Sequence, residues 1–192
     1  MQGRVKGAAI REFYVFLRQK LGVEELSLRL ERLPPEVRDE FDVHHPSLSI
    51  LPSTWYEMGL VHALLDVTLT DLPEHELDNY IRQGTHRMMK VNMGTRYHQF
   101  FFRIFLSPKL YVRHAQKLWN LHFDGGTLTA SRVSDRELLW EMRDWPGYHP
   151  LLHRIVIASE PFVFGSMGLK NVRAEPVDPP PGVVCSHSIR WD

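Results

Sequence analysis

Hydrophobic residues in the first part of the chain recur three or four positions apart, the spacing of amphipathic helices. In the first helix, expected over residues 5–21, they form one apolar stripe: Ala9, Phe13, Phe16, Leu17 and Leu21. Polar residues fall on the opposite face, which we expect to contact water: Arg11, Glu12, Arg18 and Gln19. Shorter helices are expected over residues 24–33 and 36–41, and residues 42–52 are expected to form a loop.

Two later helices begin with recognisable signals. Thr54 and Glu57 have the spacing of a capping box, in which each side chain bonds to a backbone N–H left free at a helix start. A helix is therefore expected over residues 54–67. Pro73 fits the first position of the next helix, which is expected to run toward Gly94.

The next two helices are expected to meet the core of the molecule. Residues 97–106 are apolar on nearly all sides, so they should form the most buried helix. Ser107 and Pro108 are start signals for a helix over residues 108–121, and Gly125-Gly126 follows its end. The following residues are expected on or near the inner face of that helix: Leu110, Tyr111, His114, Ala115, Leu118, Trp119 and Leu121.

After Gly126 the pattern changes to the alternation of strands. Residues 127–133 and 137–143 alternate around a turn and predict a β-hairpin. Residues 149–167 predict a helix that Pro161 kinks or interrupts, and strands are expected over 171–177 and 183–191. The predicted fold class is α+β, with a helical N-terminal half followed by a β-β-α-β-β, four-stranded antiparallel sheet with a helix packed on it.

Composition and charge narrow the class of protein. A length of 192 residues fits a single domain, 1–192, with a helical subregion over 1–124 and the β-β-α-β-β subregion over 125–192. The formal net charge of zero argues against a nucleic-acid partner. A single cysteine, Cys185, excludes an internal disulfide and fits a reducing cytoplasm. Since no apolar run approaches ~20 residues, no membrane span is expected, and we expect a cytoplasmic protein.

The linear sequence contains no complete catalytic or metal-binding motif. The eleven histidines include no HExxH pair, and His149 and His153 have no carboxylate or cysteine nearby at ligand spacing. Cys185 and His187 alternate onto one strand face, where a small buried thiol is a simpler interpretation than a nucleophile. We therefore expect no metal site, no catalytic residues and a non-enzymatic protein, although distant groups could still converge in space.

Aromatic residues are spread over the elements that should meet between helices and sheet. Most of them fit a plain hydrophobic core, and the alternative is that they line an apolar ligand pocket. The pocket candidates, with His114 or Tyr97 as a polar anchor, are Trp55, Tyr97, Phe101, Phe105, His114, Trp119 and Trp140.

Several short motifs resemble an uncharacterised family of paralogous myxobacterial proteins of similar length. The matching segments are spread over nearly the whole chain. They are Val5-Lys6-Gly7, Leu51 to Tyr56, Gly84 through Asn92 to Tyr97, His114-Ala115, Leu118-Trp119, Phe123 to Gly126, and the last strand ending at Trp191. More distantly, the C-terminal half resembles V4R-type (vinyl-reductase-type) and heme–nitric-oxide-binding domains. Gly182, Cys185, Ile189 and Trp191 are similar in spacing to the last strands of V4R-type domains.

This resemblance implies a fold that encloses a ligand between a helical layer and a sheet. Heme–nitric-oxide-binding domains have a proximal histidine on the helix before the hairpin and a Tyr-x-Ser-x-Arg run on its second strand. His114 lies on the corresponding helix, whereas residues 138–143 contain neither the tyrosine nor the serine. This departure argues against a heme cofactor.

The functional prediction is a cytoplasmic sensory or regulatory module that binds a small apolar or flat ligand between helices and sheet. The alternative is a protein–protein interaction module, for instance a homodimer, with a solid core and no ligand. Its exposed features would be loop 42–52 and the corner Trp145 to Tyr148, since exposed tryptophan and tyrosine suit interface hot spots.

Overall fold

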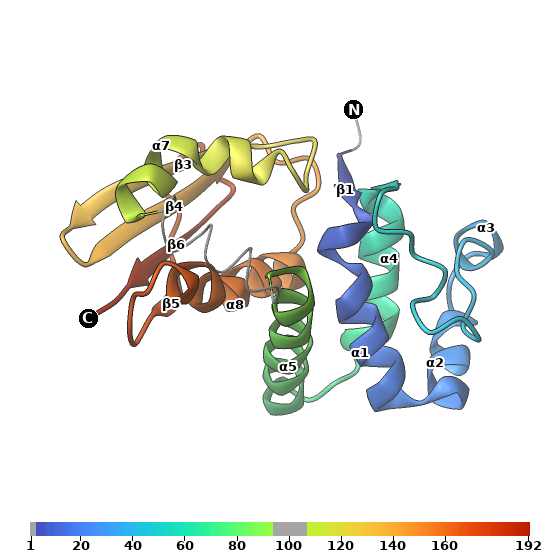
Figure 1. Cartoon of the computed structure of the whole chain (residues 1–192). Coiled ribbons are helices and arrows are strands. Elements are labelled where there is room, and N and C mark those ends of the chain that lie inside the picture. The colour runs from blue at the N-terminus through green and yellow to red at the C-terminus, as the bar shows by residue number, and fades with distance from the viewer. Residues whose placement is uncertain (1–2, 94–106) are drawn as a thin grey trace.

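The computed structural model describes residues 3–93 and 107–192 (Figure 1). Its N-terminal part contains β1 (Arg4–Lys6), the 3-10 turn η1 (Gly7–Ala9), α1 (Arg11–Leu21), α2 (Val23–Leu30), α3 (Pro35–Arg38), β2 (Trp55–Glu57), α4 (Met58–Leu69) and α5 (Glu74–Met93). Its C-terminal part contains α7 (Pro108–Trp119), β3 (Thr127–Ser134), β4 (Glu137–Arg143), α8 (Pro150–Ser166), β5 (Arg173–Val177) and β6 (Cys185–Arg190). The prediction of a mixed fold of helices and antiparallel sheet is confirmed.

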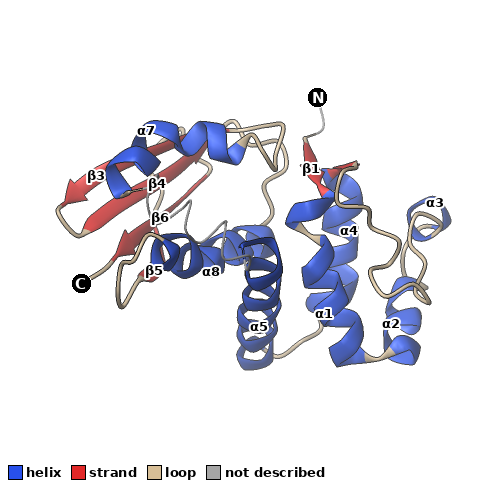
Figure 2. Cartoon of the chain, viewed as in Figure 1, coloured by secondary structure: helices blue, strands red, loops and turns tan. Residues whose placement is uncertain are grey.

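The N-terminal helices pack around α1, in which Phe13, Phe16 and Leu17 of the predicted apolar stripe are buried, while Ala9 and Leu21 are partly exposed. α1 lies beside α5, and Gly84 of α5 allows the close approach (Figure 2). A Cβ atom at Gly84 would lie 2.6 Å from Cε2 of Phe13. One polar residue was assigned wrongly to the water-facing side. Glu12 is only 7% exposed, because it pairs with Arg11 and with the Nε atom of Arg87 on α5 at 3.6 Å.

Two local predictions fail at the edges of the first helices. Residues 4–6 are not helical but form β1, which pairs with β2 so that Val5 faces Tyr56. The predicted capping box of Thr54 and Glu57 is wrong as well, because residues 55–57 are that second strand and α4 begins only at Met58 without a side-chain cap. Pairing between distant segments supplies the backbone hydrogen bonds here, and it overrides the local helix signals.

The four-stranded sheet has the strand order β3-β4-β6-β5, and all neighbouring strands are antiparallel. In the register, Trp140 of β4 lies between Ala130 of β3 and His187 of β6. Alternation places Leu138 and Met142 on the same side as Trp140, together with Ile189 and Cys185 opposite them on β6. This side, called the inner face below, is buried.

Helices α7 and α8 both cover the inner face (Figure 1). Ser107 caps α7 by accepting a hydrogen bond from the Leu110 N–H at 3.4 Å. The buried residues of α7 are Tyr111, Ala115 and Trp119, whereas Leu121, predicted on the same face, is 58% exposed because the helix ends at Trp119. The helix predicted over 97–106 lies outside the described residues.

The two parts of the chain are joined at several places. Val5 of β1 pairs with Phe123, the Lys6 N–H donates to the His122 carbonyl at 2.8 Å, and α5 packs against α8. The corner at residues 145–148 lies in this joint. Trp145, predicted to be an exposed interface residue, is only 5% exposed, because it packs edge-on against Trp119. Within the described residues, no helix has both the length and the apolar character needed to cross a membrane.

Candidate functional site

Four polar side chains lie buried together between α7, α8 and the inner face of the sheet. They are Tyr111 of α7, His153 and Glu160 of α8, and His187 of β6, and we call them the inner polar cluster. The Tyr111 hydroxyl donates to Glu160 Oε1 at 3.5 Å, and His187 Nε2 lies 3.5 Å from the same oxygen. His187 Nδ1 lies 3.2 Å from His153 Nε2. The cluster thus forms a chain from Tyr111 through Glu160 and His187 to His153.

The surroundings of the cluster determine its protonation. Burial, and next the neighbouring His187, lower the pKa of His153 from 6.5 to about 4, so this imidazole is neutral near pH 7. A neutral His153 accepts at Nε2 when His187 donates from Nδ1. Burial and then the charge of Glu160 raise the pKa of Tyr111 well above 10, which keeps its hydroxyl a donor.

Two atoms of the cluster have no hydrogen-bond partner among the described residues. They are Glu160 Oε2 and His187 Nε2, both fully buried. The 3.5 Å contact between His187 Nε2 and Glu160 Oε1 is within ion-pair distance but does not meet hydrogen-bond geometry. A buried acceptor and a buried imidazole nitrogen are therefore both available to a further polar group.

Aromatic rings form the walls around the cluster. The Trp140 ring stacks on His187 with centroids 4.5 Å apart and an interplanar angle of 24°. Trp119 meets Trp140 edge-on at 5.8 Å, and Tyr111 meets Phe164 of α8 at 4.8 Å. Flat apolar surface and a polar edge thus lie side by side, an arrangement typical of small-molecule sites.

The structure brings together only two of the predicted pocket residues. Trp119 and Trp140 are in contact, as described above. His114 lies on α7 but is only half-buried, because Tyr111, Ala115 and Trp119 occupy the buried side of that helix. Trp55 lies on β2 beside the cationic groups of Arg4 and Lys6, each 5.9 Å from its ring. Tyr97, Phe101 and Phe105 lie outside the described residues.

Sequence reasoning missed the polar members of the cluster as a set. Glu160 carried a usable signal, since it stands four positions before the buried Phe164 on the buried side of a mostly apolar helix. A carboxylate in such a stripe is rarely buried without a partner. Its partner His187 lies on another element, and the sequence pattern alone could not connect them.

The alternative chemistries named from the sequence find no support at this site. Burial raises the pKa of the Cys185 thiol to about 12, so it stays protonated and is a poor nucleophile. Among residues 3–93 and 107–192, no group of three histidine, cysteine, aspartate or glutamate side chains is arranged to hold a metal ion.

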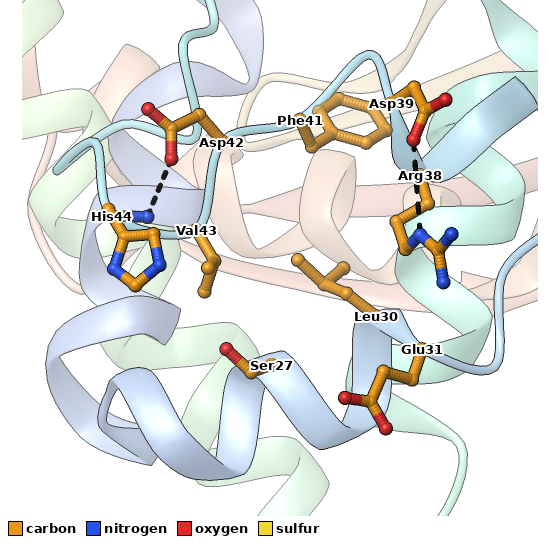
Figure 3. Close-up of a pocket in the computed structure, with 9 residues that line it drawn as sticks. All are labelled: Ser27, Leu30, Glu31, Arg38, Asp39, Phe41, Asp42, Val43 and His44. Atoms are coloured by element: carbon orange, nitrogen blue, oxygen red, sulfur yellow. Dashed lines mark hydrogen bonds and ion pairs between the residues drawn. The ribbon is translucent and has the colours of Figure 1, made fainter. Parts of the chain in front are cut away.

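Two hollows open elsewhere on the surface. The larger, of about 580 Å³, lies between α2, α3 and the following loop (Figure 3), and is lined by Ser27, Leu30, Glu31, Arg38, Asp39, Phe41, Asp42, Val43 and His44. The smaller, of about 290 Å³, lies between the start of α7 and the β3–β4 hairpin, with Lys109 and Arg132 on its rim. Neither hollow includes a residue of the inner polar cluster.

Comparison with known proteins gives a likeness of fold. No protein-family model matches the sequence, and no curated protein matches it. Among solved structures, the Fe(II) unliganded H-NOX protein from K. algicida matches with a TM-score of 0.63 and 13% identity, over 97% of this chain and 96% of that chain. An oxygen-binding H-NOX domain related to soluble guanylate cyclases matches with a TM-score of 0.59 and 12% identity, over 97% and 95% of the two chains. A structure from a study of heme distortion in the H-NOX family matches at 0.61 and 11% identity, over 97% and 95%.

The last of these structures concerns heme, so the residues of this chain are compared with what heme binding requires. A heme requires a wide flat space and a protein ligand for its iron. On the inner face, Tyr111 packs against Phe164 of α8, and Trp140 stacks on His187. The histidine of α7, His114, is half-buried and is not among the buried residues of that helix. His114 therefore does not offer a heme ligand at the inner face.

Proposed function

We propose that the chain is a sensory or regulatory module that binds a small flat ligand between α7, α8 and the inner face of the sheet. In this proposal residues 1–192 act as one domain in the cytoplasm, and the module is not an enzyme. The observation that carries the proposal is the burial of Glu160 and His187, each with one atom that has no partner among residues 3–93 and 107–192.

Stability alone does not account for such a pair. Burying polar side chains whose atoms lack hydrogen-bond partners costs free energy, and well-packed apolar residues in their place are often neutral or stabilising. Buried titratable groups with strongly altered proton affinity gather at functional sites. The cluster is thus better explained by a ligand than by the needs of the fold. The likeness of fold to an oxygen-binding H-NOX domain, and to an H-NOX structure from a study of heme distortion, supports the same kind of role.

The chemistry of the cluster defines the ligand. Glu160 Oε2 accepts hydrogen bonds, so the ligand must offer an N–H or O–H group to it. His187 Nε2 lies beside it and meets a second polar atom of the ligand. The rings of Trp119, Trp140 and Phe164 suit a flat apolar body. We therefore propose a ring system with a polar edge, rather than the purely apolar molecule expected from the aromatic residues alone.

The second candidate is a protein-interaction module, for instance a homodimer, with no ligand. The observation in its favour is the tight packing of Trp119, which stacks on Phe123 at 3.9 Å and touches Trp145 and Trp140. The Trp145 corner no longer supplies an interface, because Trp145 is buried. Loop 42–52 would remain, with Leu51 exposed.

Native mass spectrometry separates the two candidates. The protein is incubated with cell extract, repurified and weighed in native and denatured form, with an absorption spectrum of the same sample. We expect an extra mass that is released on denaturation. Glu160→Gln, which keeps the shape and removes the charge, should lose that mass, and the exposed Glu175→Gln on β5 should keep it.

Two results would contradict the ligand proposal. A clean apo mass with an unchanged melting temperature after incubation favours the interaction module. A bound mass of equal occupancy in the wild type and in the Glu160→Gln variant places the ligand elsewhere, for example in the hollow of Figure 3.

A further inference from the structure

A second group of titratable residues lies where α4 meets the turn before α8. The joint is tight, because a Cβ atom at Gly147 would lie 2.6 Å from Cγ of Met58 on α4. His62 Nε2 lies 3.1 Å from the Gly147 carbonyl oxygen, and His149 Nε2 lies 3.1 Å from Asp66 Oδ1. Two side chains one turn apart on α4 thus hold both ends of the short segment that leads into α8.

His149 has two roles that fix the position of its proton. It is the N-cap of α8, and its Nδ1 accepts a hydrogen bond from the Leu151 N–H at 3.2 Å. Nδ1 is therefore unprotonated, and the single proton of a neutral ring lies on Nε2 and points to Asp66. Protonation of His149 would place an N–H on Nδ1 against the Leu151 N–H. It would also put a positive charge at the helix N-terminus, where the macrodipole disfavours cations.

Protonation of His62 would also weaken the contact between α4 and the segment before α8. Its ring lies 4.9 Å from that of His149, and its Nε2–H donates to the Gly147 carbonyl. Burial first, and then the neighbouring His149, lower the pKa of His62, while the Gly147 carbonyl and Asp66 act in the opposite sense. Two protonated imidazoles at this distance would repel each other.

The remaining charged groups around the joint do not reverse the effect expected from protonating His62 and His149. Asp66 attracts a protonated His149, but its side chain is 56% exposed, so water screens the attraction. Tyr14 of α1 is fully buried and neutral, and burial and the charge of Asp66 raise its pKa. Arg154 of α8 is engaged by Glu74 and Asp78 of α5.

We propose that His62, Asp66 and His149 form a pH-sensitive latch between α4 and the start of α8. The latch is closed when both imidazoles are neutral. Protonation of the imidazoles removes the cap of α8 and releases the 145–149 segment from α4. Because α8 also carries His153 and Glu160, release of its first turn loosens one wall of the inner polar cluster. The latch rests on its own contacts and stands whether or not the cluster binds a ligand.

Hydrogen exchange followed by mass spectrometry tests the latch in the full chain. Peptides covering residues 145–155 are compared between about pH 7.5 and pH 5.5, after correction for the intrinsic rate of exchange. We expect protection there to fall about fivefold at the lower pH, the change that follows from losing one N-cap of ordinary strength.

His149→Asn is the decisive variant. Asparagine caps helices well and its amide can donate to Asp66, but it does not titrate. Protection in the variant should therefore be nearly equal at the two pH values. His62→Gln keeps a donor for the Gly147 carbonyl and should reduce the pH response. The exposed His75→Gln on α5 should respond as the wild type does, since His75 has a side-chain exposure of 82%.

Any of three outcomes overturns the proposal. The first is wild-type protection over residues 145–155 that does not change with pH. The second is a fall in His149→Asn as large as that in the wild type, which would assign the pH response to other groups. A response retained in His149→Asn but lost in His62→Gln also contradicts the cap as the sensitive element.

Discussion

Acidification should destabilise this protein through His153 of the inner polar cluster. Burial and the neighbouring His187 lower the pKa of His153 from 6.5 to about 4 in the folded chain. In the unfolded chain the imidazole is free to take a proton at its ordinary pKa. As pH falls from about 6.5 to 4, the unfolded state binds more protons than the folded state, so stability is lost over this range and is fully present above it.

The size of the effect follows from the two pKa values. At about 1.4 kcal/mol per pKa unit, the difference corresponds to about 3 kcal/mol below pH 4 and about 2 kcal/mol at pH 5. His153 is buried, with 7% of its surface exposed. Residual contact with water reduces the expectation to roughly 1–2 kcal/mol at pH 5. This is a large share of the stability of an ordinary domain, about 5–15 kcal/mol.

Urea unfolding of the wild type and of His153→Gln, each at about pH 8 and pH 5, measures this contribution. Glutamine retains an acceptor for His187 and does not titrate. The free energy of unfolding should fall less on acidification in the variant, by roughly 1–2 kcal/mol. Histidines that do not contact His153 contribute equally to both proteins and cancel. If the variant and the wild type lose the same free energy between the two pH values, His153 is not held neutral and the protonation assigned to the cluster is wrong.

Three further predictions concern packing and reactivity. Gly84→Ala should destabilise the protein by ~1–3 kcal/mol in thermal or urea unfolding, because the added Cβ would clash with a ring of α1. The control Gly59→Ala, on the open side of α4, should be neutral or stabilising by up to ~1 kcal/mol. Equal effects of the two changes would contradict the α1–α5 packing. Trp119→Ala should lower the free energy of unfolding by about 3–5 kcal/mol, because it leaves a cavity where a buried ring was. Trp55 is half-exposed, so Trp55→Ala should lower it clearly less. A small loss at Trp119 would instead indicate that its ring is a pocket wall. Cys185 should resist maleimide labelling at about pH 8 in the folded protein and react after unfolding, because burial raises the pKa of its thiol to about 12. Rapid labelling of the native protein would show that the thiol is not buried and protonated.

Much of the secondary structure was predictable because its signals are local. The Ser107 cap of α7 and the alternation of the β3–β4 hairpin are patterns within a dozen residues, and the structure has the elements they predict. The errors at residues 4–6 and 54–57 have one cause. The two segments are short, and each is a strand only because the other lies beside it. Fifty residues of chain separate them, and no local pattern reports such a pairing.

Less of the candidate site than of the fold could be predicted from the sequence. The aromatic pair Trp119 and Trp140 was named in advance, since large rings near a predicted helix–sheet contact are expected in a core or pocket. The polar cluster was not, because Tyr111 and Glu160 are 49 residues apart and His153 and His187 are 34 residues apart. The prediction of an exposed Trp145 failed for a related reason. Its burial depends on Trp119, which belongs to another element.

The sequence by itself determined the order of helices and the later strands, because the spacing of apolar residues follows from the geometry of each element. It also determined that the chain has no local motif of catalysis. Only the tertiary structure decided which titratable groups lose water and which of them face each other. Proton affinity depends on burial and on neighbours within a few ångströms. Both are set by the packing of α7, α8, α4 and the sheet, so the inner polar cluster and the histidine latch exist only in the folded chain.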